Sequence, residues 1–195
     1  VNPAGLGPAS DDESEADRLA LSFSGGYGFD AWLRAMESHG TSVNQGSFLG
    51  ASTVRTYAAG MRMGAATPVE LDTMKAVVRR AMEDGAFGLS TGLDYPPGAY
   101  ADTNELVELC KVVAERGGFY HTHTRHSLSV NGHMAPFEEA VEIGRRSGAP
   151  VHLTHFRQSA QGTGSHLDYI GLVENSREEG LDVTFDCYTY IYSGT

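Results

Sequence analysis

Residues 117–156 read GGFYHTHTRHSLSVNGHMAPFEEAVEIGRRSGAPVHLTHF and predict a strand, a helix and a second strand in succession. The short aromatic and β-branched run at 118–122 predicts the first strand, and a similar run at 150–154 predicts the second. Between them, apolar residues at helical spacing predict a helix from about 136, ending at Gly148. Two strands joined by a helix lie parallel with a right-handed crossover. This stretch therefore predicts one unit of a parallel α/β sheet.

The same unit recurs on both sides of this stretch. The glycines that end the expected helices are spaced 32, 31 and 32 residues apart, which matches one strand, one helix and two short loops. These glycines are Gly85, Gly117, Gly148 and Gly180. The remaining predicted strands are 42–50, 86–91 and 181–186, and the remaining predicted helices are 67–85, 103–117 and 165–180. Five strands with crossover helices predict either an open doubly wound sheet or part of an eight-stranded barrel.

Composition limits the class of protein. The chain has 195 residues, 14 Lys and Arg against 25 Asp and Glu, and a formal net charge of −11. This charge disfavours nucleic acid and anionic lipid as partners, and no apolar run is long enough for a membrane span. Two cysteines form neither a disulfide framework nor a metal knuckle, so we expect a reducing, cytoplasmic location. Residues 1–27 predict an exposed lead-in, and residues 28–195 predict the packed domain.

Histidines stand at the ends of two neighbouring predicted strands. In parallel α/β folds the active site lies at the C-terminal ends of the strands. His123 ends one predicted strand, and His155 occupies the same place one unit later. Paired imidazoles of this kind predict a divalent metal site, typically zinc. Three nearby histidines are interpreted as packing or loop residues: His121, His126 and His152.

Other side chains near these strand ends are candidates for a pocket. The loop 90–100 contains two prolines and predicts either a stiff turn or a pocket wall that presents Tyr95, with Asp94 a weaker candidate. Alternate aromatic residues at 185–190 fit either the core or the lining of a pocket. Arg157 is costly to bury without an anionic partner, and a substrate carboxylate would serve as that partner.

Several motifs, in order along the chain, resemble the N-acyl-D-amino-acid deacylases (D-aminoacylases) of the amidohydrolase superfamily. GAFGLSTGLDYPPG at 85–98 is the most specific of them. The others are GASTVR at 50–55, ATPVE at 66–70, THTR at 122–125, THFR at 154–157 and DCYTY at 186–190. The resemblance covers about residues 40 to 195.

The resemblance implies a (β/α)8 TIM barrel in which the chain supplies about the third to the seventh strands. It also implies that zinc is bound by the histidines ending the fifth and sixth strands, which match His123 and His155. Family contacts to substrate, carried over by motif, fall on Tyr95, Arg157, Tyr188, Tyr190 and Ser193.

The resemblance further implies zinc-dependent cleavage of the amide bond of a small molecule, an N-acyl-D-amino acid, to a D-amino acid and a carboxylate. The family's HxH pair, its cysteine ligand and its general-base aspartate are expected outside residues 1–195. The chain is therefore interpreted as an internal segment that needs the remainder of its own barrel, and we expect the isolated segment to be inactive.

Two alternatives and one question of assembly stay open from the sequence. One alternative is a related amidohydrolase that acts on a cyclic amide or imide with the same metal site. The other is a catalytically incomplete metal-binding fragment. Oligomeric assembly also stays open.

Overall fold

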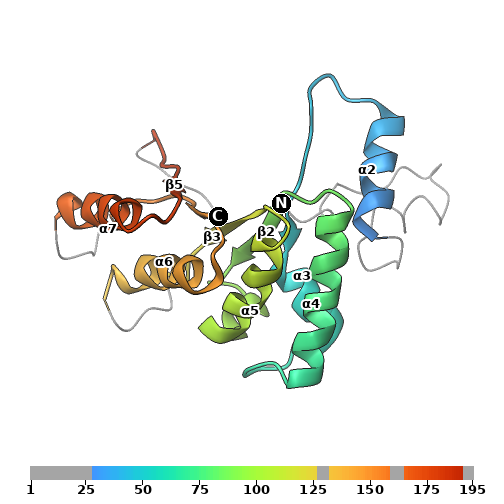
Figure 1. Ribbon diagram of the computed structural model, residues 1–195, viewed down its shortest axis with the longest axis horizontal. Coiled ribbons are helices and arrows are strands. Elements are labelled where there is room, and N and C mark those ends of the chain that lie inside the picture. Colours follow the sequence, from blue (N-terminus) through green and yellow to red (C-terminus); the bar gives the residue numbers. More distant parts are fainter. Residues whose placement is uncertain (1–27, 127–131, 159–164, 191–195) are drawn as a thin grey trace.

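The computed structural model describes residues 28–126, 132–158 and 165–190 (Figure 1). The predicted lead-in 1–27 and Ser193 lie outside the described residues. In chain order the elements are α2 Gly28–His39, β1 Leu49–Gly50, α3 Ala51–Ala59, α4 Pro68–Glu83, β2 Gly88–Gly92, the 3-10 turn η3 Gly98–Tyr100, α5 Thr103–Ala114, β3 Phe119–His123, α6 Ala135–Ser147, β4 Val151–Leu153, α7 His166–Glu178 and β5 Val183–Phe185.

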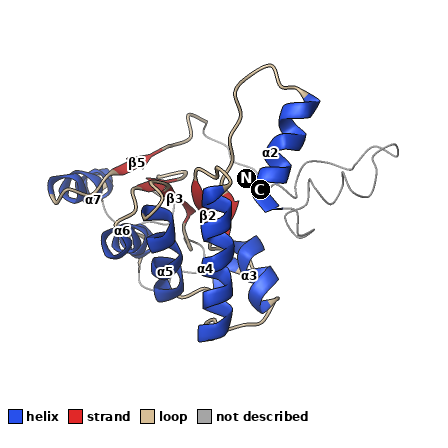
Figure 2. Ribbon diagram, turned by 45° about the vertical axis from the view of Figure 1, so that its right-hand side comes forward, coloured by secondary structure: helices blue, strands red, loops and turns tan. Residues whose placement is uncertain are grey.

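The five strands form one parallel sheet in the order β1-β2-β3-β4-β5. Each strand therefore pairs with the next one along the chain, whereas a doubly wound sheet changes direction at a switch point. Helices α4 to α7 follow one another along one side of the strands (Figures 1 and 2). This arrangement is that of part of a (β/α)8 barrel, and it decides between the two architectures that the sequence left open.

The two faces of the sheet differ in character because side chains alternate along a strand. In β3, Tyr120 and Thr122 are buried against the helices, while His121 and His123 lie on the opposite face. In β4, Val151 and Leu153 are buried and His152 shares the face of the other histidines. The face away from the helices corresponds to the interior of a barrel, and it carries the imidazoles.

The apolar core lies between the sheet and the helices. Its fully buried members on the helices include Met74, Val78, Leu106, Val113 and Ile143. Helix α6 approaches β4 so closely that a Cβ added to Gly144 would lie 2.2 Å from Val151 Cγ2. A glycine at this position lets the helix pack directly on the strand.

A buried ion pair ties the N-terminal part of the fold together. Arg55 of α3 and Glu105 of α5 are 1% and 4% exposed and are hydrogen-bonded to each other. Arg55 also donates to the carbonyl of Gly64, and Glu105 accepts from the backbone N–H of Ala66 at 3.2 Å. The pair thus joins α3, α5 and the loop that leads into α4.

Helix α4 begins as its sequence predicts. The Thr67 side chain accepts from the Glu70 N–H, the Glu70 side chain accepts from the Thr67 N–H, and Pro68 is the first helical residue. The structure also confirms the other three predicted helices and four of the five predicted strands, with ends that shift by a few residues.

The prediction for residues 42–50 was too long, and helix α3 was not predicted. Only Leu49 and Gly50 pair with β2, and α3 starts directly at Ala51. The residues before this strand include exposed polar side chains, among them Asn44 and Gln45, which belong to a loop. Because α3 is short and follows the strand without a loop, no start signal separates the two elements.

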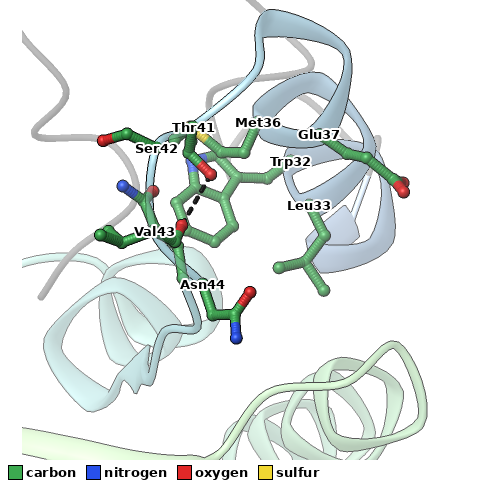
Figure 3. A pocket seen from close by; sticks show the side chains of 9 residues that line it. Trp32, Leu33, Met36, Glu37, Thr41, Ser42, Val43 and Asn44 are labelled. Atoms are coloured by element: carbon green, nitrogen blue, oxygen red, sulfur yellow. Dashed lines mark hydrogen bonds between the residues drawn. The ribbon is translucent and has the colours of Figure 1, made fainter.

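Helix α2 and the loop that follows it line an open pocket of about 530 Å³ (Figure 3). Trp32 and Met36 of the helix face Thr41 and Asn44 of the loop across this space. Of the predicted site residues that the structure describes, none lines this pocket. Among the described helices, none has the length and apolar character needed to cross a bilayer.

We expect loss of either partner of the buried ion pair to destabilise the fold. Arg55→Met or Glu105→Gln leaves one buried charge without its counter-charge, which costs about 3 to 5 kcal/mol in the free energy of unfolding. Chemical denaturation of the intact natural protein measures this loss. Arg34→Met is the matched control, because Arg34 pairs with Asp30 at the surface with side chains 75% and 43% exposed, and we expect a change below about 1 kcal/mol. A loss below about 1 kcal/mol for Arg55→Met would contradict the role of the pair.

Candidate functional site

Two histidines meet at the C-terminal end of the sheet. His123 is the last residue of β3, where it pairs with Gly92 of β2, and His155 follows the end of β4 by two residues. His123 Nδ1 lies 3.0 Å from His155 Nε2, and the two rings are inclined at 68°. The structure therefore brings together the two residues that the sequence predicted as a metal pair.

A carboxylate holds the other side of the His123 ring. Asp94 Oδ2 lies 3.0 Å from His123 Nε2, and the Asp94 side chain is only 9% exposed. A carboxylate at Nε2 favours the tautomer with its proton on that nitrogen, which leaves the lone pair of Nδ1 facing His155. Carboxylate–histidine pairs of this kind orient imidazole ligands of metals. Asp94, a weaker candidate in the sequence, thus contacts the site directly.

The donor set fits a divalent metal of the zinc type. In the neutral form, each imidazole offers one lone pair, and the two facing nitrogens are separated by about the distance between neighbouring ligands of a tetrahedral ion. Burial lowers the pKa of His155, and the nearby His123 ring lowers it further, which favours the neutral form that can donate to a metal.

Aromatic side chains and one cation surround the pair. Tyr188 stacks on the His155 ring with a centroid distance of 5.3 Å and an interplanar angle of 3°. Tyr95 lies against His123 at 5.4 Å. The guanidinium of Arg157 lies 5.6 Å from the centre of the Tyr188 ring. The side chains of Tyr95, Tyr188 and Arg157 are also solvent-accessible, which leaves them available to a ligand.

Two further residues, Tyr190 and Ser193, were predicted to contact substrate. Among the described residues, no contact links Tyr190 to the two histidines. Tyr190 is 79% exposed, and Ser193 lies outside the described residues. Their assignment to substrate stays a prediction.

A second polar cluster lies deeper on the same face of the sheet. His121, His152 and Asp186 can bring one ligand atom each within 4.8 Å of one another. His152 Nε2 lies 3.0 Å from Asp186 Oδ2, and His121 Nε2 lies 3.0 Å from Thr154 Oγ1. Burial lowers the pKa of His121 to about 4, with a further contribution from His152. His121 and His152 are hydrogen-bonded parts of the inner face of the sheet.

Sequence reasoning missed Asp186 as an individual residue of the site. Burial raises the pKa of Asp186, but hydrogen bonds from the His155 backbone N–H and the His152 side chain outweigh this and lower it. The signal was present in the alternation of the last strand, since Asp186 lies two residues beyond Thr184 and so shares its face.

Relatives with a known activity match the chain in sequence. No family model matches it. It is 32% identical to the D-aminoacylase of Alcaligenes xylosoxydans xylosoxydans in an alignment 195 residues long, which covers 97% of the chain and 40% of that enzyme. It is also 32% identical to N-acyl-D-glutamate deacylase from the same organism over 167 residues, 84% of the chain and 33% of that enzyme. The chain thus spans about a third to two fifths of the length of these relatives.

Solved structures match the fold. An N-acyl-D-glutamate deacylase from Bordetella bronchiseptica, crystallised with zinc and a phosphonate mimic of the tetrahedral intermediate, aligns with a TM-score of 0.79 and 29% identity, covering 96% of this chain and 39% of that one. A D-aminoacylase described as defining a novel subset of amidohydrolases aligns with a TM-score of 0.76 and 30% identity, covering 97% of this chain and 40% of that one.

The parallel sheet, its sequential strand order and these alignments define an amidohydrolase-type α/β fold. Within that class, the chain is similar to the D-aminoacylases and N-acyl-D-amino-acid deacylases over a third to two fifths of their length.

The contact between Asp94 and His123 predicts the tautomer of that ring. In the metal-free intact protein we expect His123 to carry its proton on Nε2, because the carboxylate accepts from it. Nitrogen-15 chemical shifts of the imidazole measure this directly. Asp94→Ala removes the acceptor and should give a mixture of tautomers, whereas Asp72→Ala, an exposed carboxylate on α4, should change nothing. A proton on Nδ1 in the unaltered protein would contradict the arrangement.

Proposed function

We propose that this protein is a zinc-dependent hydrolase that cleaves the amide bond of N-acyl-D-amino acids to a D-amino acid and a carboxylate. The observation that carries the proposal is the 3.0 Å approach of His123 Nδ1 to His155 Nε2 at the C-terminal end of a parallel sheet. Relatives named as deacylases of N-acyl-D-amino acids supply the reaction class.

In the proposed site, His123 and His155 would hold zinc through the ring nitrogens that face each other. When bound, zinc polarises the amide carbonyl and lowers the pKa of a coordinated water. Asp94 keeps His123 in the required tautomer through its contact with Nε2. Tyr188 covers one face of His155 and limits rotation of that ring.

The side chains around the histidines suit the rest of such a substrate. Arg157 offers a guanidinium that can bind the amino-acid carboxylate by two parallel hydrogen bonds. The guanidinium of Arg157 lies near the uncharged ring of Tyr188. A carboxylate could therefore bind the guanidinium without displacing a charged group from that side. We assign Tyr95 to the wall beside the scissile amide, and Tyr188, Tyr190 and Ser193 to further substrate contacts.

The proposal extends to the barrel and to the location of the protein. We treat residues 1–27 as a lead-in and residues 28–195 as part of a single (β/α)8 domain, in which further strands pair with the free edges of β1 and β5. In the sheet formed by the described residues these two strands are outermost, and outermost strands offer backbone groups that a closed barrel pairs. Free thiols at Cys110 and Cys187 fit a reducing, cytoplasmic compartment.

Removal of the metal or of one ligand should abolish hydrolysis of N-acetyl-D-methionine by the intact natural protein. We expect a chelator to eliminate activity and zinc to restore it. His155→Ala should lower kcat/KM by about 1,000-fold or more at any zinc concentration, because the metal loses a direct ligand. His166→Ala, at an exposed position of α7, is the matched control and should keep full activity. Full activity of His155→Ala would refute the assignment.

The choice of substrate separates this proposal from a cyclic-amide hydrolase with the same metal site. We expect turnover of N-acetyl-D-methionine to exceed turnover of a hydantoin under identical conditions. Faster opening of the hydantoin would favour the cyclic-amide activity instead.

Arg157→Met should act mainly on substrate binding. Loss of a charge-assisted contact to the carboxylate should raise KM by about 10- to 100-fold with a smaller change in kcat. Arg116→Met, which removes an arginine paired with Glu83 at the protein surface, is the matched control. An unchanged KM for Arg157→Met would remove Arg157 from the substrate site.

A further inference from the structure

The turn after β4 is built around one residue at the end of β5. The backbone N–H of Asp186 donates to the Leu153 carbonyl at 3.1 Å, and the Asp186 carbonyl accepts from the Phe156 N–H at 2.8 Å. Its side chain reaches the residue between them, because Asp186 Oδ1 accepts from the backbone N–H of His155 at 2.8 Å. One residue therefore makes three hydrogen bonds to the turn that carries His155.

That turn needs support, because His155 adopts a left-handed backbone conformation with φ of 51°. In the described ranges 28–126, 132–158 and 165–190 it is the sole non-glycine residue with positive φ. Residues other than glycine adopt the left-handed backbone conformation only where the surrounding structure imposes it. The hydrogen bond from the His155 N–H to a carboxylate is such a constraint.

This backbone conformation decides where the imidazole lies. With it, His155 Nε2 comes to 3.0 Å from His123 Nδ1. Tyr188, two residues beyond Asp186, stacks on the same imidazole. The end of β5 thus holds both the main chain and the ring of His155.

The carboxylate of Asp186 is itself held in place. His152 Nε2 lies 3.0 Å from Asp186 Oδ2, and His152 Nδ1 lies 2.8 Å from Thr184 Oγ1. A hydrogen-bonded chain therefore runs from β5 through β4 and back to the turn. Because the side chain of Asp186 is half exposed, this chain rather than burial fixes its orientation.

The same cluster is poorly arranged to bind a metal of its own. The rings of His121 and His152 are stacked at a centroid distance of 5.1 Å and an interplanar angle of 7°. An imidazole binds a metal in the plane of its ring, and one ion cannot lie in the planes of two stacked rings. The cluster instead fits a support for the neighbouring pair.

We propose that Asp186 is a positioning residue, whose carboxylate holds the backbone of His155 so that its imidazole and that of His123 converge on one metal ion. The inference rests on the metal site of the proposed function. It predicts that zinc affinity depends on a side chain that does not touch the metal, through its acceptor oxygen rather than through its charge.

The test compares three variants of the intact natural protein by their dissociation constants for zinc, measured by competition with a chromophoric chelator. Asp186→Ala removes the acceptor and should weaken zinc binding by about 10- to 100-fold. Asp186→Asn keeps a carbonyl oxygen for the His155 N–H and should stay within about threefold of the unaltered protein. Asp182→Ala removes an exposed carboxylate near the start of the same strand and should change nothing. Thermal unfolding checks that each variant is folded.

Unchanged zinc affinity in folded Asp186→Ala would overturn the inference, as would equal losses in Asp186→Ala and Asp186→Asn. His155→Ala distinguishes failure of the positioning role from failure of the proposed metal site. Unchanged zinc binding in His155→Ala would refute the metal site itself. If Asp186→Ala weakens zinc binding and Asp186→Asn restores it while the unaltered protein cleaves no N-acyl-D-amino acid, the positioning role stands and the proposed activity fails.

Discussion

The approach of two imidazole nitrogens from neighbouring strands organises this end of the molecule. Parallel pairing of β3 and β4 sets Tyr120 opposite Val151 and Thr122 opposite Leu153, so that the two strands end side by side. His123 extends from the end of one strand and His155 from the turn after the other, with 3.0 Å between their facing nitrogens. Such a contact between two rings needs support from both sides, because few forces otherwise hold partly exposed imidazoles in one orientation.

That support comes from the strands on either side. Asp94, in the loop after β2, contacts the far nitrogen of His123, and Asp186, at the end of β5, contacts the backbone of His155. The sequential order of the strands is what places β2 and β5 on opposite flanks of the pair. On the other face of the sheet, apolar side chains pack against the helices, and the buried pair of Arg55 and Glu105 ties α3 to α5. The fold thus separates an apolar face that stabilises it from a polar face that can perform chemistry.

Much of this arrangement was predictable from the sequence, because its signals are local. The capping box at Thr67 and the helix-ending Gly148 mark their helices, and both occur where predicted. The meeting of His123 and His155 followed from their equal places in successive units. Strand order was not predictable, because sequential and doubly wound sheets share the same alternation of strand and helix. The roles of Asp94 and Asp186 depend on contacts between strands, and the left-handed conformation of His155 depends on those contacts in turn. Residue type and spacing along the chain do not predict these contacts between strands.

The location of bound zinc tests the central claim most directly. Crystals of the intact natural protein loaded with zinc would give an anomalous difference map at the zinc edge. We predict a peak within about 2.0 to 2.2 Å of both His123 Nδ1 and His155 Nε2. A peak at His121, His152 and Asp186 with none between His123 and His155 would contradict it, as would the absence of any zinc peak at the end of the sheet.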